Sequence, residues 1–131
     1  YISNNNIIHI DLIKSDTEGF DCKAIYGAEK ALKDGIIDIW QFEYNHRWID
    51  SKNYLKDVFK FVEDKGYMVG KLCEKKIQVY SEWNPELERF FEANYLLIKK
   101  QNRLVKKISQ FYTYDYSNVL VPDKTRRFWW S

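Results

Sequence analysis

The sequence is poor in the residues that build metal centres, disulfide scaffolds and membrane spans. Only two cysteines occur, Cys22 and Cys73, and no C-x-x-C spacing links them. This argues against a zinc site and a disulfide framework, and suits a reducing compartment such as the cytoplasm. The longest apolar runs, such as residues 95–98, are far shorter than the roughly 20 residues of a membrane-spanning helix. The polar start lacks a basic segment, so we expect no signal peptide.

Methionine is equally scarce. The only one is Met68, so Tyr1 is not a natural translation start, and we expect the chain to be part of a longer protein. Its 131 residues fit one domain with a real core, and 45% hydrophobic with 31% charged residues is typical of a globular protein. The net charge of +2 is too small to indicate nucleic-acid binding. The basic residues concentrate after residue 100, which leaves the preceding part slightly acidic.

Apolar patterns predict strands that alternate with helices. The strands are expected at residues 7–14, 36–44, 67–72, 77–80 and 95–99. Helices are expected from Phe20 to a stop at Gly35, from a cap at Ser51 to Gly66, and from the Asn84-Pro85 cap to Phe91. The second helix has the clearest apolar stripe, formed by Tyr54, Leu55, Val58, Phe59 and Val62. This order favours an α/β fold with a mostly parallel sheet and helices on both faces.

Two polar clusters follow the first two predicted strands, where ligands bind in open α/β sheets. The first contains Asp16, Glu18 and Gly19. A carboxylate there could accept a proton, bind a cation or hold a sugar hydroxyl, and the glycine permits a tight turn. A structural alternative exists for Glu18, because Ser15 and Glu18 have the spacing of a helix capping box. Asp16 is not needed for that box.

The second cluster spans residues 42–48 and contains Glu43, Asn45, His46, Arg47 and Trp48. An acid that ends an apolar strand needs a partner or a role, which makes Glu43 a candidate catalytic residue. Hydrogen-bonding groups beside aromatic rings suit a sugar, so Asn45, His46 and Arg47 are candidate substrate-binding residues. The alternative is that the aromatic residues are core and that His46 and Arg47 are solvated.

The ordered motifs resemble the FkbM-type methyltransferase signature. Residues 10–21, IDLIKSDTEGFD, and 26–32, YGAEKAL, match its lysine, acidic and Glu-Gly block and the helix that follows. Residues 39–45, IWQFEYN, look like the next strand, and Gly66-Tyr67 and 94–96 resemble later landmarks. The resemblance covers roughly residues 7–99. Ser15 stands where the family usually has a hydrophobic residue.

This resemblance implies the C-terminal half of a Rossmann-like class I methyltransferase sheet, with residues 95–99 inserted antiparallel between 36–44 and 67–72. It also implies S-adenosylmethionine-dependent O-methylation of a sugar or natural-product hydroxyl, with Asp16, Glu18 and Glu43 at the transfer cleft. No G-x-G occurs among the five glycines. We therefore expect most of the S-adenosylmethionine to be held by sequence absent from this chain, and the chain alone to be inactive.

Residues 101–131 lie outside the resemblance and form an expected C-terminal extension to a methyltransferase part at 1–100. Leu104, Val105, Ile108 and Phe111 predict a short basic amphipathic helix, and residues 126–130 are basic and aromatic. Such a tail could pack onto the domain, a second subunit or another partner.

The sequence leaves two other functions open. One is a non-catalytic methyltransferase-like module in an assembly. The other is an enzyme that binds a divalent cation such as magnesium through oxygen atoms of Asp16, Glu43 and Asn45.

Overall fold

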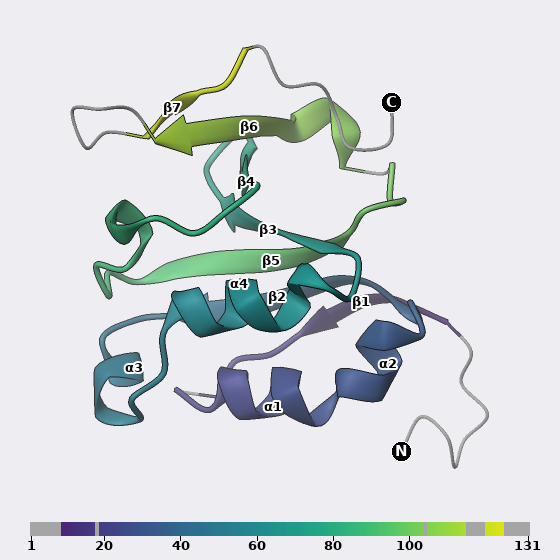
Figure 1. Cartoon of the computed structure of the whole chain (residues 1–131), viewed down its shortest axis with the longest axis vertical. Helices are drawn as coiled ribbons and strands as arrows, with labels where there is room; N and C mark the ends of the chain where they lie inside the picture. Colours follow the sequence, from purple (N-terminus) through teal and green to yellow (C-terminus); the bar gives the residue numbers. More distant parts are fainter. Residues whose placement is uncertain (1–8, 18, 104, 115–119, 125–131) are drawn as a thin grey trace.

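The computed structural model describes residues 9–17, 19–103, 105–114 and 120–124. Its strands form one sheet in the order β1-β2-β5-β3-β4-β6-β7 (Figure 1). Their bounds are β1 Ile10–Lys14, β2 Ile37–Tyr44, β3 Tyr67–Leu72, β4 Ile77–Tyr80, β5 Ala93–Lys99, β6 Ser109–Tyr114 and β7 Leu120–Pro122. The first five lie where the sequence predicts strands.

The direction of the strands differs in part from the prediction. β1 and β2 are parallel, and β5 lies antiparallel between β2 and β3, as the family resemblance implies. However, four of the six neighbouring pairs among the described strands are antiparallel, so the expectation of a mostly parallel sheet is wrong. A parallel neighbour needs a long crossover, whereas only residues 73–76 separate β3 from β4.

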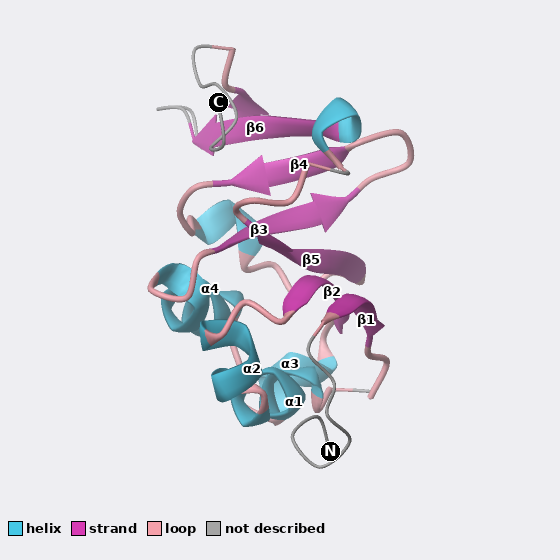
Figure 2. Ribbon diagram, turned by 90° about the vertical axis from the view of Figure 1, so that its right-hand side faces the viewer, coloured by secondary structure: helices cyan, strands magenta, loops and turns pink. Residues whose placement is uncertain are grey.

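The α-helices gather on one face of the sheet, over the β1 to β3 half (Figure 2). They are α1 Asp21–Gly27, α2 Glu29–Lys33, α3 Arg47–Asp50 and α4 Leu55–Glu63, with 3-10 turns η1 Pro85–Leu87 and η2 Lys106–Ile108. The expectation of helices on both faces is therefore not met in the described residues. The helix predicted from Phe20 breaks in two at Ala28 and stops before Gly35, whose φ of 67° suits glycine.

The main core fills the space between these helices and the sheet. Leu55, Val58 and Val62 of the predicted stripe are buried in it, together with Trp48 and Phe42. A smaller cluster contains Met68, Ile77, Val79, Leu96, Ile98 and Phe111.

The cap predicted for α4 is wrong. Ser51 follows α3, where its Oγ donates to the carbonyls of Arg47 and Trp48. The first backbone N–H groups of α4 instead donate to the Glu88 carboxylate, 33 residues beyond Leu55 in sequence. By contrast, the Asn84 side chain caps η1 as predicted, although this helix ends at Leu87 rather than Phe91.

The residues after 100 also differ from the prediction. In place of an amphipathic helix over 104–111, η2 is a single 3-10 turn and β6 pairs in parallel with β4. Pairing on β4 buries Phe111, which explains why an extended strand is preferred to a short surface helix. Residues 126–130 lie outside the described residues. No helix in the described part of the chain is long and apolar enough to cross a membrane.

Candidate active site

The loop that leaves β1 is held in place by the buried carboxylate of Asp21. The Asp21 side chain has 0% exposure and accepts hydrogen bonds from the Thr17 backbone N–H and side-chain hydroxyl. It also accepts the Ser15 hydroxyl at 3.2 Å and the Glu43 backbone N–H at 2.8 Å. Because these donors come from the ends of β1 and β2, Asp21 fixes the two strand ends relative to each other. Sequence reasoning missed this residue.

Ser15 has a different role from the predicted capping box. Its Oγ donates to Asp21 and accepts the Trp40 indole N–H at 3.0 Å, while α1 starts at Asp21 without a side-chain cap. The departure from the usual hydrophobic residue therefore adds a hydrogen-bond bridge between β1, β2 and α1. Glu18, the other half of the box and a predicted catalytic residue, lies outside the described residues.

The carboxylates of Asp16 and Glu43 lie near each other where β1 and β2 end, close enough for Asp16 to influence the pKa of Glu43. An Asn45 amide hydrogen bond acts to lower the pKa of Glu43. The influence of Asp16, partial burial and repulsion from Glu92 outweigh it, so the pKa lies above its usual 4.5. Glu43 is therefore easier to protonate than an ordinary glutamate. The ends of parallel strands meet at one edge of a sheet. This geometry brings together Asp16 and Glu43, two of the three predicted catalytic acids.

The Asn45 side chain holds Glu43 in position. Its side chain is only 7% exposed, and its Nδ2 donates to Glu43 Oε1 at 2.9 Å. Its Oδ1 accepts the Arg47 backbone N–H at 2.9 Å, which starts α3. Both polar ends of Asn45 are therefore used inside the chain, so its contacts are those of a positioning residue for Glu43.

A surface hollow of about 490 Å³ lies beside the loop and is lined by Gly19, Phe20, Lys23, Arg47, Asp50 and Ser51. Gly19 has a φ of 103°, and a Cβ there would lie 3.2 Å from Arg47 Cβ, so the loop and α3 approach closely. Arg47 is thus placed at a concave surface, as a substrate-binding residue requires. His46 is exposed and is not among the residues that line this hollow.

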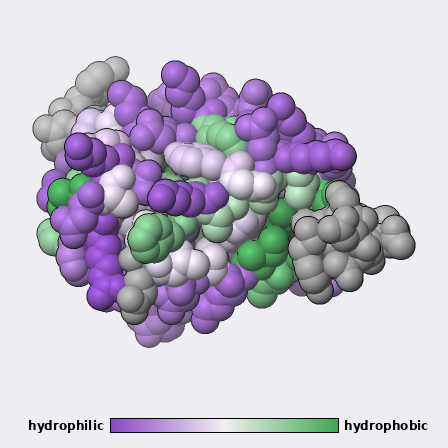
Figure 3. All heavy atoms as spheres, turned by 90° about the horizontal axis from the view of Figure 1, so that it is seen from below, coloured by the Kyte–Doolittle hydropathy of each residue, from purple (hydrophilic) through white to green (hydrophobic). Residues whose placement is uncertain are grey.

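The surface around β1, α1 and α3 carries apolar as well as polar side chains, since Leu12, Phe20 and Ile49 are exposed. Seen from this side, hydrophilic side chains surround groups of apolar ones (Figure 3). Phe20, at 56% exposure, is one of the exposed rings, and Lys23 Nζ lies 5.3 Å from its centroid. An aromatic ring next to two cationic side chains suits a polar ligand better than a lipid-like one.

The described residues give less support to catalysis by a cysteine nucleophile or by a metal ion. Burial raises the pKa of the Cys22 thiol to about 12, so this cysteine is no nucleophile. One group of three metal-ligating side chains exists in the described part, His9, Asp11 and Asp38. It sits at the opposite ends of β1 and β2 from Asp16, and His9 Nε2 lies 2.8 and 3.2 Å from the two carboxylates, as in an ordinary exposed ion pair.

The comparison with protein families identifies the domain. The model described as "Methyltransferase FkbM domain" matches residues 1–69. No curated protein and no solved structure matches significantly. The matched stretch contains β1, β2 and all four α-helices, and with them the Asp16–Glu43 pair. Since it covers more than half of the 131 residues, the chain belongs to the FkbM methyltransferase domain family.

Proposed function

We propose that this chain is part of an S-adenosylmethionine-dependent O-methyltransferase that acts on a hydroxyl of a sugar or related natural product. The observation that carries the proposal is the Asp16–Glu43 pair at the ends of two parallel strands. S-adenosylmethionine supplies an activated methyl group on a positively charged sulfonium. The acidic pair suits that charge, so the residues present fit the reacting end of the cofactor.

The pair also suits the proton that methyl transfer must remove. Bound S-adenosylmethionine would supply the methyl group, and the acceptor hydroxyl would have to give up its proton to a group of the protein. A carboxylate whose pKa is raised toward neutrality accepts a proton more readily than an ordinary one. Glu43 accepts this proton with Asp16 as its partner, while Asn45 holds Glu43 in place for alignment of the reacting atoms.

The acceptor would enter from the hollow beside the loop. Arg47 and Lys23 provide donors for its oxygen atoms, and Phe20 provides a flat apolar face. The chain has no G-x-G turn, so the nucleoside part of S-adenosylmethionine would be held by other sequence. The two cysteines are free thiols, which suits a cytoplasmic enzyme.

The test is calorimetric titration of S-adenosylmethionine, followed by transfer of a tritiated methyl group to a panel of glycosides. It should use the chain both alone and joined to any natural flanking sequence. Asp16→Asn and Glu43→Gln should each lower turnover about 100-fold or more, a larger loss than the accompanying loss of cofactor affinity. Asp11→Asn, at the opposite end of β1 and exposed, is the matched control and should leave turnover unchanged.

Each other outcome points to a specific alternative. Unchanged turnover in Asp16→Asn would remove the role given to Asp16. Absence of cofactor binding in every form would favour a non-catalytic module that contacts a partner. Loss of turnover on addition of a chelator would favour cation-assisted chemistry at Asp16 and Glu43.

A further inference from the structure

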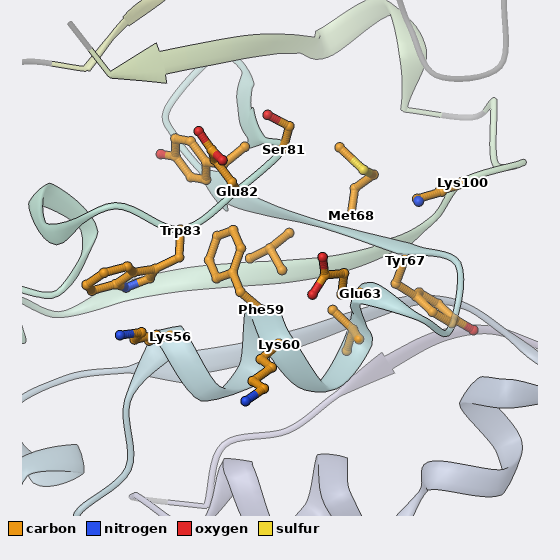
Figure 4. A pocket seen from close by; sticks show the side chains of 13 residues that line it. Lys56, Phe59, Lys60, Glu63, Tyr67, Met68, Ser81, Glu82, Trp83 and Lys100 are labelled. Atoms are coloured by element: carbon orange, nitrogen blue, oxygen red, sulfur yellow. The ribbon is translucent and has the colours of Figure 1, made fainter.

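A second concave site lies on the helix-covered face, between α4 and the strands β3 and β4 (Figure 4). Its volume is about 240 Å³, and neither Asp16 nor Glu43 lines it. The base is formed by the buried side chains of Val62, Val69 and Tyr80. The walls come from Phe59 and Glu63 of α4 on one side and from residues 81–83 on the other.

The wall that carries Trp83 is fixed in place by other contacts. The Trp83 indole N–H donates to Glu88 Oε1 at 3.2 Å, and Lys56 Nζ lies 5.1 Å from the centroid of the indole ring. The same Glu88 carboxylate accepts the Tyr44 hydroxyl and the first N–H groups of α4. Because one carboxylate holds both walls, the groove is formed before any ligand binds, which lowers the entropic cost of binding.

The groove contains both hydrogen-bond donors and hydrogen-bond acceptors. Glu63 and Glu82 offer hydrogen-bond acceptors, while Ser81 and Lys100 offer donors. The Glu63 carboxylate points up into the groove, whereas the Lys60 ammonium points to the other side of α4 (Figure 4). Phe59 and Trp83 add aromatic faces next to these groups. A simple anion or a simple cation would meet a side chain of its own sign here.

We propose that this groove binds a single neutral, polyhydroxylated ring, such as one pyranose unit of a glycan. The hydroxyls of such a ring both donate and accept, which matches the mixed polar groups, and its apolar C–H face packs on an aromatic ring. The volume is below the range of pockets that hold drug-sized ligands, which favours one ring over a chain of several. This inference does not depend on methyl transfer.

The experiment is a titration of the ¹⁵N-labelled chain with methyl glycosides of glucose, galactose, mannose and fucose, followed by two-dimensional NMR. We expect saturable shifts in the amides of Phe59, Glu63 and residues 81–83 with at least one glycoside, at a Kd on the order of 1 mM. Trp83→Ala should weaken this binding at least fivefold. Glu63→Gln, an exposed change that leaves the core intact, should weaken it as well. Phe91→Ala, which removes a 73% exposed ring outside the groove, is the control and should bind as the wild type does.

Three results would overturn the proposal. The first is the absence of saturable shifts in the groove with every glycoside. The second is binding that Trp83→Ala and Glu63→Gln do not weaken. The third is tighter binding of inorganic phosphate or tetramethylammonium in the groove, because it would make the site one for an anion or for a cation.

Discussion

Two kinds of carboxylate occur in this molecule, and they have opposite surroundings. Asp21 and Glu88 each accept several hydrogen bonds, from donors that lie far apart in the sequence. Asp16 and Glu43 instead face each other, with the Asn45 amide as the described donor to Glu43. Asp21 and Glu88 hold elements of the fold together, whereas the carboxylates of Asp16 and Glu43 repel each other where β1 and β2 end.

Asp21 and Glu88 therefore have a structural role, and Asp16 and Glu43 are the candidates for a chemical one. The oxygen atoms of Asp21 and Glu88 are taken up by hydrogen bonds that connect separate elements of the fold. A pair of like-charged carboxylates is unfavourable for folding and persists where a function requires it. Substitutions that change one kind of carboxylate, or its surroundings, at a time can test this difference.

The largest effect is expected for Asp21→Ala. It removes the buried carboxylate that accepts the part-buried N–H groups of Thr17 and Glu43, so the free energy of unfolding should fall by about 3–5 kcal/mol. Asp16→Ala, five residues earlier and exposed, should change it by less than about 0.5 kcal/mol. Urea denaturation of both variants measures this. Equal losses would show that Asp21 and Asp16 do not differ in role.

Glu88→Ala should have the next largest effect, a loss of about 2–3 kcal/mol. It removes the acceptor for the start of α4 and for the Tyr44 hydroxyl. Glu86→Ala breaks only a bond to exposed Arg89 among the side-chain contacts described, and should cost about 0.5 kcal/mol. Hydrogen exchange should show faster exchange at the first turn of α4 in Glu88→Ala alone. Unchanged protection there would contradict the cap.

Some parts of the fold can be predicted from the sequence, and others cannot. The strands from β1 to β5, the stripe of α4 and the Asn84 cap follow from local patterns, because each depends on neighbouring residues. The meeting of Asp16 and Glu43 follows from the geometry of parallel strand ends. The role of Glu88 could not be found in this way, since Tyr44, Leu55 and Lys56 lie 32 to 44 residues away. The bond from the Glu43 N–H to Asp21, 22 residues away, is likewise set by the tertiary fold. Pairing of β6 with β4 overrides the helical pattern after residue 103 for the same reason.

Gly19→Ala tests the backbone of the loop that carries Asp16. Because Gly19 has a φ of 103° and lies against Arg47, alanine should cost about 1–2 kcal/mol. Gly27→Ala is the matched control, since a Cβ there meets no atom within 4 Å, and it should be neutral or stabilising by up to about 1 kcal/mol. Thermal unfolding distinguishes the two. A neutral Gly19→Ala would mean that the loop adapts freely.

The smallest effect on stability is expected for Glu43→Gln, and it should depend on pH. A carboxyl group whose pKa is raised by folding favours the folded state in its protonated form. Its contribution is complete well below 4.5 and is lost as the pH rises through the folded-state value. Glutamine cannot ionise, so the variant should match the wild type at low pH and exceed its stability slightly at neutral pH. A variant that is less stable at neutral pH would contradict this sign.

The most direct test of the acid pair is a pH titration of the Glu43 side-chain carboxyl by ¹³C NMR, in the wild type and in Asp16→Asn. We predict a Glu43 pKa above 4.5 in the wild type and a clear fall in the variant, because the variant removes the like charge beside it. An ordinary Glu43 pKa that Asp16→Asn leaves unchanged would show that Asp16 does not act on Glu43, and would contradict the proposed reacting pair.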